Sequence, residues 1–138
     1  MKKILCLILA LIVCVALVAC GGYSKTLPAS FDADTVQSAA EDFFALLHEG
    51  DYEGLFELFS PELQAQVSAE DLEAAVTPIL ADKGAFVKFS RTNLLGHTDK
   101  ESSAEYAICL YTAEFENGKV NYTLSFNSDM TVGGFYLK

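Results

Sequence analysis

The sequence has little positive charge. Its 138 residues include nine Lys and Arg against nineteen Asp and Glu, so the formal net charge is −10. Between Lys25 and Lys83 there are thirteen acidic residues and no Lys or Arg, whereas residues 83–138 hold six of each sign. Binding to nucleic acid depends on cations that neutralise phosphates. We therefore exclude nucleic acid as a partner.

The acidic half of the chain has two interpretations. We interpret it as a solvated helical surface that keeps the protein soluble. The alternative is a face for a cationic partner or for loosely held Ca²⁺, although the sequence lacks the spacing of an EF-hand loop. Solubility is the interpretation that the composition favours.

Motifs for catalysis and metal binding are also missing. The chain has no Gly-x-Ser-x-Gly elbow and no pair of closely spaced cysteines. Its two histidines, His48 and His97, share no short ligand spacing. We expect His48 to complement the C-terminus of a helix and His97 to be solvated in a loop. The sequence thus predicts no catalytic residue, no metal site and no cofactor.

A signal segment occupies the N-terminus. Lys2 and Lys3 precede an apolar run of 14 residues from Ile4 to Leu17, shorter than the roughly 20 residues that span a bilayer. This pattern is typical of a secretory signal peptide. The segment Leu17-Val18-Ala19-Cys20 resembles the lipobox of bacterial lipoproteins. The resemblance implies cleavage before Cys20 and diacylation of its thiol. The alternative is an ordinary secreted protein cut near Ala19.

This N-terminus implies a domain organisation: residues 1–19 are the signal peptide, residues 20–32 the lipidated cysteine and tether, and residues 33–138 a single domain. The mature chain would have 119 residues and sit on the extracytoplasmic face of the cell membrane, anchored by lipid on Cys20. Residues 21–30 are small and polar, and we expect a flexible coil with a reach of roughly 17 Å. Cys109 would be the only free thiol, and we expect it to be inert packing.

Helical periodicity extends over residues 34–82. Asp34 with Gln37 predicts the start of a first helix, and Gly50 its end. Shorter helices follow after Asp51, Ser60 and Ser68, and we expect a kink or an early end of the last one at Pro78. The apolar faces of these helices are formed by Val36, Ala40, Phe43, Phe44, Leu47, Tyr52, Leu55, Phe56, Phe59, Leu72, Val76, Ile79 and Leu80.

From Gly84 onwards the period changes to two. Strands are predicted at residues 85–92, at residues 106–115, at residues 119–127 and at residues 131–137, with a bulge at Gly133-Gly134. Asn117-Gly118 predicts a two-residue hairpin loop that pairs Phe115 with Val120 and Tyr111 with Leu124. The core face then carries the odd-numbered residues of the strand that ends at Phe115. The opposite face carries Tyr106, Ile108 and Leu110.

Helices followed by an antiparallel meander predict an α+β fold, in which N-terminal helices pack on a curved sheet of about four strands. This order resembles the cystatin-like, cone-shaped nuclear transport factor 2-like superfamily, and more narrowly the bacterial domain-of-unknown-function family numbered 3887. The resemblance covers residues 33–138. It rests on Phe43-Phe44, Gly50-Asp51-Tyr52, Leu72, the hairpin from Phe115 to Val120, and Gly134-Phe135. The superfamily includes isomerases, dehydratases and binding modules, so it implies a fold more than a function.

We interpret the chain as a surface-tethered lipoprotein with a non-catalytic domain that binds a ligand or a protein. A pocket between helices and sheet would hold a small apolar molecule, lined by Phe43, Tyr111, Tyr122 and Leu124. The apolar positions on the opposite sheet face, namely Tyr106, Ile108 and Leu110, would be an interface for a protein partner or a second copy.

Two alternatives stay open. The first is a small cone-fold enzyme, isomerase- or dehydratase-like, that acts on a hydrophobic small molecule with Tyr111 or Tyr122 and a buried carboxylate. Asp42 and Glu57 fall on or near polar helix faces, so the sequence provides no clear carboxylate partner. The second is a structural module whose only task is presentation near the membrane.

The lipid anchor gives a first testable prediction. Cys20→Ser is expected to leave an unprocessed or soluble protein, because acylation requires the thiol. Metabolic labelling with a fatty acid, followed by detergent-phase partitioning, measures the change. Cys14→Ser, a matched substitution within the signal segment, should keep the label. Equal labelling of wild type and Cys20→Ser would rule out this anchor.

Overall fold

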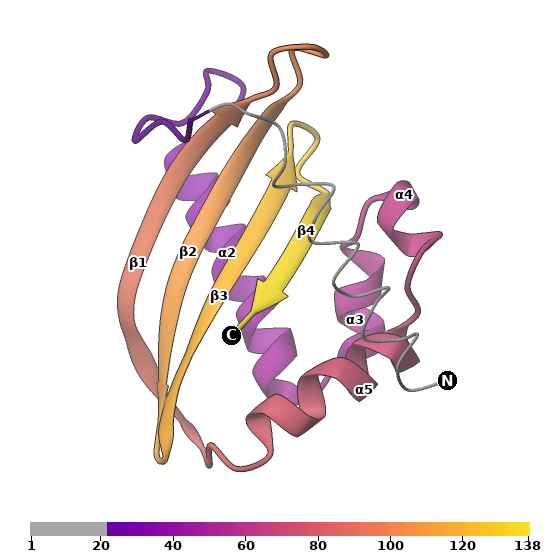
Figure 1. Ribbon diagram of the computed structural model, residues 1–138, viewed down its shortest axis with the longest axis vertical. Coiled ribbons are helices and arrows are strands. Elements are labelled where there is room, and N and C mark those ends of the chain that lie inside the picture. Colours follow the sequence, from indigo (N-terminus) through magenta and orange to yellow (C-terminus); the bar gives the residue numbers. More distant parts are fainter. Residues whose placement is uncertain (1–21) are drawn as a thin grey trace.

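The computed structural model describes residues 22–138, and the signal segment and Cys20 lie outside the described residues. It has the α+β fold that the sequence predicts, with helices first and a four-stranded antiparallel sheet after them (Figure 1). Within residues 22–138, no helix is long and apolar enough to cross a membrane. The elements are α2 (Ala33–Glu49), α3 (Tyr52–Glu57), α4 (Pro61–Gln64), α5 (Ala69–Leu80), β1 (Phe86–Thr98), β2 (Glu105–Phe115), β3 (Gly118–Asn127) and β4 (Val132–Leu137).

The first helix begins two residues earlier than its sequence signature indicates. The N-cap is Asp32, not Asp34: the Asp32 carboxylate accepts hydrogen bonds from the Thr35 amide at 2.9 Å and from the Thr35 hydroxyl at 2.8 Å. These bonds favour the charged carboxylate and lower the pKa of Asp32. The helix ends, as expected, at Gly50, whose φ of 76° suits glycine.

The later helices start at the expected caps, but α5 does not stop at Pro78. Ser68 and Asp71 form a complete capping box at its start. Proline removes only the hydrogen bond to the Ala74 carbonyl, and residue 74 is exposed to water. The amide of Ala81 still donates to Thr77 at 2.9 Å. Of the two expected outcomes, a kink or an early end, the early end is wrong, because the proline lies in the last turn, where one missing bond is tolerated.

The sheet is a meander in the order β1-β2-β3-β4. Strand β1 is longer than predicted and extends to Thr98, with irregularities near Val87 and Ser90 where the register shifts. The predicted bulge near Gly133 is confirmed by a register shift between Ser125 and Phe126. The three strand pairs place side chains alternately on an inner face toward α2 and on an outer face.

The register of the central hairpin differs from the prediction by two residues. The loop consists of Glu116 and Asn117, and Phe115 pairs with Gly118 rather than with Val120. The amides of Glu116 and Asn117 donate to the carbonyls of Ala85 and Lys83, at 3.0 and 2.8 Å, so the segment before β1 holds this turn. A shift of two residues leaves every side chain on its predicted face, because the period of a strand is two.

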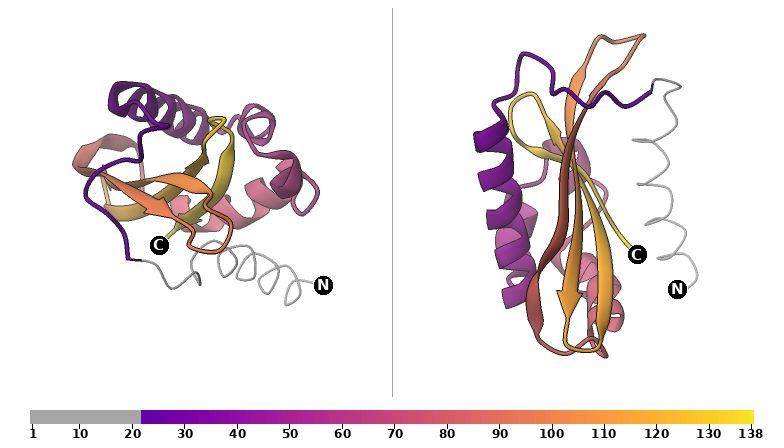
Figure 2. Two further views of the ribbon diagram at one scale, coloured as in Figure 1. Left: turned by 90° about the horizontal axis from the view of Figure 1, so that it is seen from above. Right: turned by 90° about the vertical axis from the view of Figure 1, so that its left-hand side faces the viewer.

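The helices cover one face and one edge of the sheet. Figure 2 shows α2 lying along the inner face, and Figure 1 shows α3, α4 and α5 gathered beside β4. The segment between α3 and α4 pairs with the edge of β4, since the amide of Ser60 donates to Val132 at 2.9 Å and that of Val132 to Leu58 at 2.8 Å. The core therefore lies between α2, the inner sheet face and the short helices.

The residues expected to be a free tether lie against the sheet. Ser24 pairs with Gly96 in β1 through two backbone hydrogen bonds of 2.8 Å. Phe31, which the sequence assigns to the tether, is only 9% exposed and belongs to the core. The estimate of a coil over residues 21–30 thus fails from Ser24 onward.

The packing of α2 gives a second prediction. Phe43 is fully buried, whereas Phe86 is 36% exposed. Phe43→Ala is expected to cost about 3–5 kcal/mol of unfolding free energy, because it leaves a cavity that rigid neighbours cannot fill. Phe86→Ala, the matched control, should cost clearly less. Denaturant titration measures both, and equal losses would contradict the packing described here. Phe56, expected to be as buried as Phe43, is half-buried.

Candidate functional site

The four residues predicted to line a pocket meet inside the domain. Phe43, Tyr111, Tyr122 and Leu124 are each at most 2% exposed. The ring of Phe44 lies 4.9 Å from the rings of both Tyr111 and Tyr122, and Phe43 packs against Phe135 at 4.9 Å between ring centroids. Side chains therefore occupy the space between α2 and the sheet at these positions.

His48 belongs to this aromatic cluster and does not act as a cation at the end of α2. Its ring stacks on Phe86 at 4.3 Å between centroids, and its Nε2 lies 3.1 Å from the Tyr122 hydroxyl. Burial lowers the pKa of His48 from 6.5 to about 4. The ring is therefore neutral at neutral pH. The expected interaction of a charged His48 with the helix dipole is wrong.

Other reactive groups of the inner face are held in their neutral forms. Cys109 is fully buried, and burial raises the pKa of its thiol to about 12, as expected for inert packing. Burial also raises the pKa of Tyr111 to about 12, and its hydroxyl has no hydrogen-bond partner among the described residues. The buried polar residues of the described chain are Ser60, His97 and Ser125. The enzyme alternative needs a buried carboxylate, and this set does not supply one.

The three predicted interface residues share the outer face of the sheet, as their alternation indicates. Ile108 is 6% exposed, and Tyr106 and Leu110 are half-buried. Two apolar residues that the sequence analysis missed share this face: Leu95 pairs with Ile108, and Tyr136, which is 41% exposed, is separated from Leu110 by its partner Thr123. We name this surface the apolar half of the outer face, consisting of Leu95, Tyr106, Ile108, Leu110 and Tyr136.

No local pattern in the sequence assigned Leu95 and Tyr136 to this face. Leu95 lies beyond the predicted end of its strand at Thr92. The face of the last strand could not be assigned, because the length of the turn near Ser128 was open. That turn spans residues 128–131 in the structure and includes Met130 at a φ of 67°.

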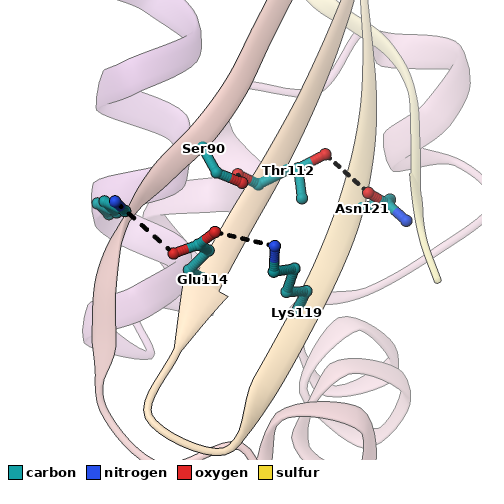
Figure 3. A network of polar contacts seen from close by, with 6 residues as sticks. Ser90, Thr112, Glu114, Lys119 and Asn121 are labelled. Atoms are coloured by element: carbon teal, nitrogen blue, oxygen red, sulfur yellow. Dashed lines mark hydrogen bonds and ion pairs between the residues drawn. The ribbon is translucent and has the colours of Figure 1, made fainter.

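The remaining outer face, toward the β2–β3 hairpin, is charged and polar. Glu114 forms an ion pair with Lys119 (Figure 3), with 3.0 Å between Oε1 and Nζ, and Nζ of Lys88 lies 3.9 Å from the same carboxylate. The hydrogen bond from Lys119 lowers the pKa of Glu114. The hydroxyl of Thr112 donates to the side-chain oxygen of Asn121 at 2.8 Å. We name this surface the polar half of the outer face.

His97 is not the solvated loop residue that the sequence suggested. It lies within β1 and is 6% exposed. Its ring lies between those of Tyr23, at 5.8 Å, and Tyr106, at 6.0 Å between centroids. Its Nδ1 has no partner among the described residues. Within the described part of the chain, no three His, Cys, Asp or Glu side chains are grouped so that they could hold a metal ion.

The fold and its packed interior define a small α+β domain with helices on one face of an antiparallel sheet. The chain belongs to the family described as "Protein of unknown function (DUF3887)", which matches residues 40–135. A solved structure, described as "NMR structure of protein from Ruminococcus gnavus ATCC 29149", is similar to it. The two are 28% identical, with a TM-score of 0.71 over 84% of this chain and 99% of that one. None of the curated proteins compared matches the chain.

The environment of His48 gives a third prediction. Between pH 6.5 and 4, His48 takes up a proton in the unfolded chain but not in the folded protein. The contribution of His48 to the free energy of unfolding is therefore constant above this window and falls as the pH drops through it. We expect a loss of about 1–2 kcal/mol, since solvent reaches part of the ring. Denaturant titrations at several pH values, for wild type and His48→Gln, isolate this effect from that of the carboxylates. Parallel pH dependences for the two proteins would show that His48 is protonated in the fold.

Proposed function

We propose that the protein is a membrane-tethered, non-catalytic binding module that works through the outer face of its sheet. The tether is supported by the signal pattern of residues 1–19 and by the lipobox that ends in Cys20. Ser24, four residues after that cysteine, pairs with Gly96 of β1. Helices over one face of a four-stranded sheet also support a place in the nuclear transport factor 2-like superfamily.

The observation that carries this proposal is the contrast between the two faces of the sheet. On the inner face, a ligand would have to displace side chains such as Phe43 and Leu124, which are fully buried and in contact with their neighbours. On the outer face, apolar side chains lie on three of the four strands: Leu95 on β1, Tyr106, Ile108 and Leu110 on β2, and Tyr136 on β4, with Thr123 of β3 between Leu110 and Tyr136. An outer strand position that faces water is normally polar. Tyr136 is 41% exposed and Leu95, Tyr106 and Leu110 are half-buried, so part of this apolar surface is open to a binding partner, as at interaction sites.

The cone-fold enzyme remains the second candidate and has less support. Its best feature is the pair formed by His48 and the Tyr122 hydroxyl. This pair lies within an aromatic cluster, and no described Asp or Glu is buried beside it. Binding at the surface therefore explains more of the structure than chemistry in the interior.

A cysteine-accessibility experiment tests the docking surface and gives a fourth prediction. Thr123→Cys places a thiol on the outer face, between Leu110 and Tyr136, and Ser38→Cys places the matched control on the exposed side of α2. A membrane-impermeant maleimide is applied to the tethered protein in isolated membranes and to the soluble domain of residues 22–138. Cys109 is fully buried, so it adds little background.

The expected result is at least about threefold slower labelling at position 123 in membranes than in the soluble domain, with no such difference at position 38. Such protection would show that the outer face is covered in the tethered state. Equal labelling rates at position 123 in both preparations would contradict the proposed docking surface.

A further inference from the structure

We infer that the occupant of the outer sheet face is the lipid surface to which the protein is anchored, a bilayer that contains anionic lipids. The domain would lie with this face on the membrane and with α2 turned away from it. This inference rests on the tether and docking surface of the proposed function and names what covers that surface. Four features of the described residues support it: the point of anchoring, the charges, the apolar side chains and the poor fit of a second copy.

The anchoring point holds one corner of the sheet close to the lipid. Only three residues separate Cys20 from Ser24, so the two Cα atoms are at most about 14 Å apart. Ser24 is fixed to Gly96 by two hydrogen bonds, at the edge of β1, where the indigo segment passes the end of that strand in Figure 1. If Cys20 carries the lipid, this short segment therefore keeps the edge of β1 close to the bilayer.

Close packing makes the attachment firm. A Cβ atom on Gly96 would lie 2.7 Å from Cδ of Pro28 and would also clash with the Thr26 carbonyl. Residues 26–28 thus cross the strand where only glycine leaves enough room. Phe31 follows and enters the core. The domain is consequently held by a short, docked strap rather than by a free coil, and its orientation relative to the anchor is restricted.

The two layers of the domain carry opposite charge. Four cations lie on the outer face, three placed by the strand register and Lys138 by its pairing with Asn121: Lys88, Arg91, Lys119 and Lys138. Glu114 is the one carboxylate on this face within the described strands. The Lys88 and Lys119 side chains are 65% and 63% exposed. Helix α2, on the other layer, carries exposed Asp34, Glu41, Asp42 and Glu49 and no Lys or Arg. An anionic bilayer attracts the first layer and repels the second.

The apolar half lies next to the anchor, as a membrane-bound face requires. Tyr23, which is 49% exposed, packs on His97 beside Ser24, and Tyr136 lies across the sheet. Tyrosine is enriched at the level of lipid headgroups, where its ring is partly buried and its hydroxyl stays wet. Apolar and aromatic side chains combined with Lys and Arg on one face are typical of structures that lie on a membrane.

A second copy fits the same face less well. In a sheet-to-sheet dimer, both partners would bring a face with four cations and one carboxylate. Like charges brought together across an interface disfavour that pairing. The bilayer has no such conflict, because its anionic headgroups complement the cations.

The test is to reconstitute the lipidated mature protein, residues 20–138, into vesicles. A fluorophore is attached to Thr123→Cys on the outer face or to Ser38→Cys on α2, and the vesicles contain a lipid with a nitroxide on its headgroup. We expect at least about threefold stronger quenching at position 123 than at position 38 in vesicles of phosphatidylglycerol and phosphatidylcholine. The difference should shrink in pure phosphatidylcholine and at 1 M salt, because salt screens the charges.

Charge reversal provides a matched pair of variants. Arg91→Glu changes a cation on the outer face, whereas Lys100→Glu makes the same change in the loop between β1 and β2. Arg91→Glu should reduce the quenching at position 123 by about half, and Lys100→Glu should leave it within error of the parent protein. Both positions are exposed, so a loss of folding does not confuse the comparison.

Three results would overturn the inference. If the protein does not float with vesicles, the tether fails and the proposed function fails with it. If the protein floats but both fluorophores are quenched equally, the membrane-facing sheet is wrong while the tether stands. If position 123 is shielded from the maleimide but not quenched, and the shielding grows with protein density, the occupant is another protein molecule.

Discussion

The contact between α2 and the sheet, centred on the ring of Phe44, is the interaction on which the other features depend. This ring lies between Tyr111 of β2 and Tyr122 of β3, at 4.9 Å from each. Aromatic pairs at such distances stabilise a fold beyond the area that they bury. Because this contact fills the inner face, the interior offers a packed core, and Tyr122 in turn orients His48 at the end of the helix. The binding module that we propose therefore works through its surface, and the register of the sheet decides which side chains that surface presents.

Periodicity predicted the elements and faces well, because each depends on local repeats of apolar residues. The apolar positions of α2 and the alternation of β2 and β3 were all assigned to the correct side. The failures come from contacts distant in sequence. The hairpin loop moved by one residue because Lys83 and Ala85 bind its amides. His97 became buried because Tyr23, more than seventy residues earlier in the chain, covers its ring. No local pattern contains that information.

The candidate surface was predictable in part for the same reason. The alternation of the strand placed Tyr106, Ile108 and Leu110 on the face opposite the core, where polar residues are expected. Leu95 and Tyr136 were not, since their strands could be placed only with the neighbouring strands in view. The charge asymmetry was evident in the sequence as a count. The count did not show where the charges lie in space. The strand register assigns cations such as Lys88 and Arg91 to the outer face of the sheet, and the carboxylates of α2 lie on the opposite layer.

The irregular edge of β1 would hinder edge-to-edge pairing between copies of this domain anchored to the same membrane. An uninterrupted edge strand offers a row of free backbone groups to which the same edge of a neighbour can pair, and sheets that extend in this way aggregate. Here the extra residues near Val87 and Ser90 break the repeat, and Ser24 occupies the edge at Gly96. At the other edge, the segment that follows α3 pairs with β4. Anchoring in one membrane would raise the frequency at which two domains meet. The interrupted edges would then prevent a dense layer of domains from pairing into one continuous sheet.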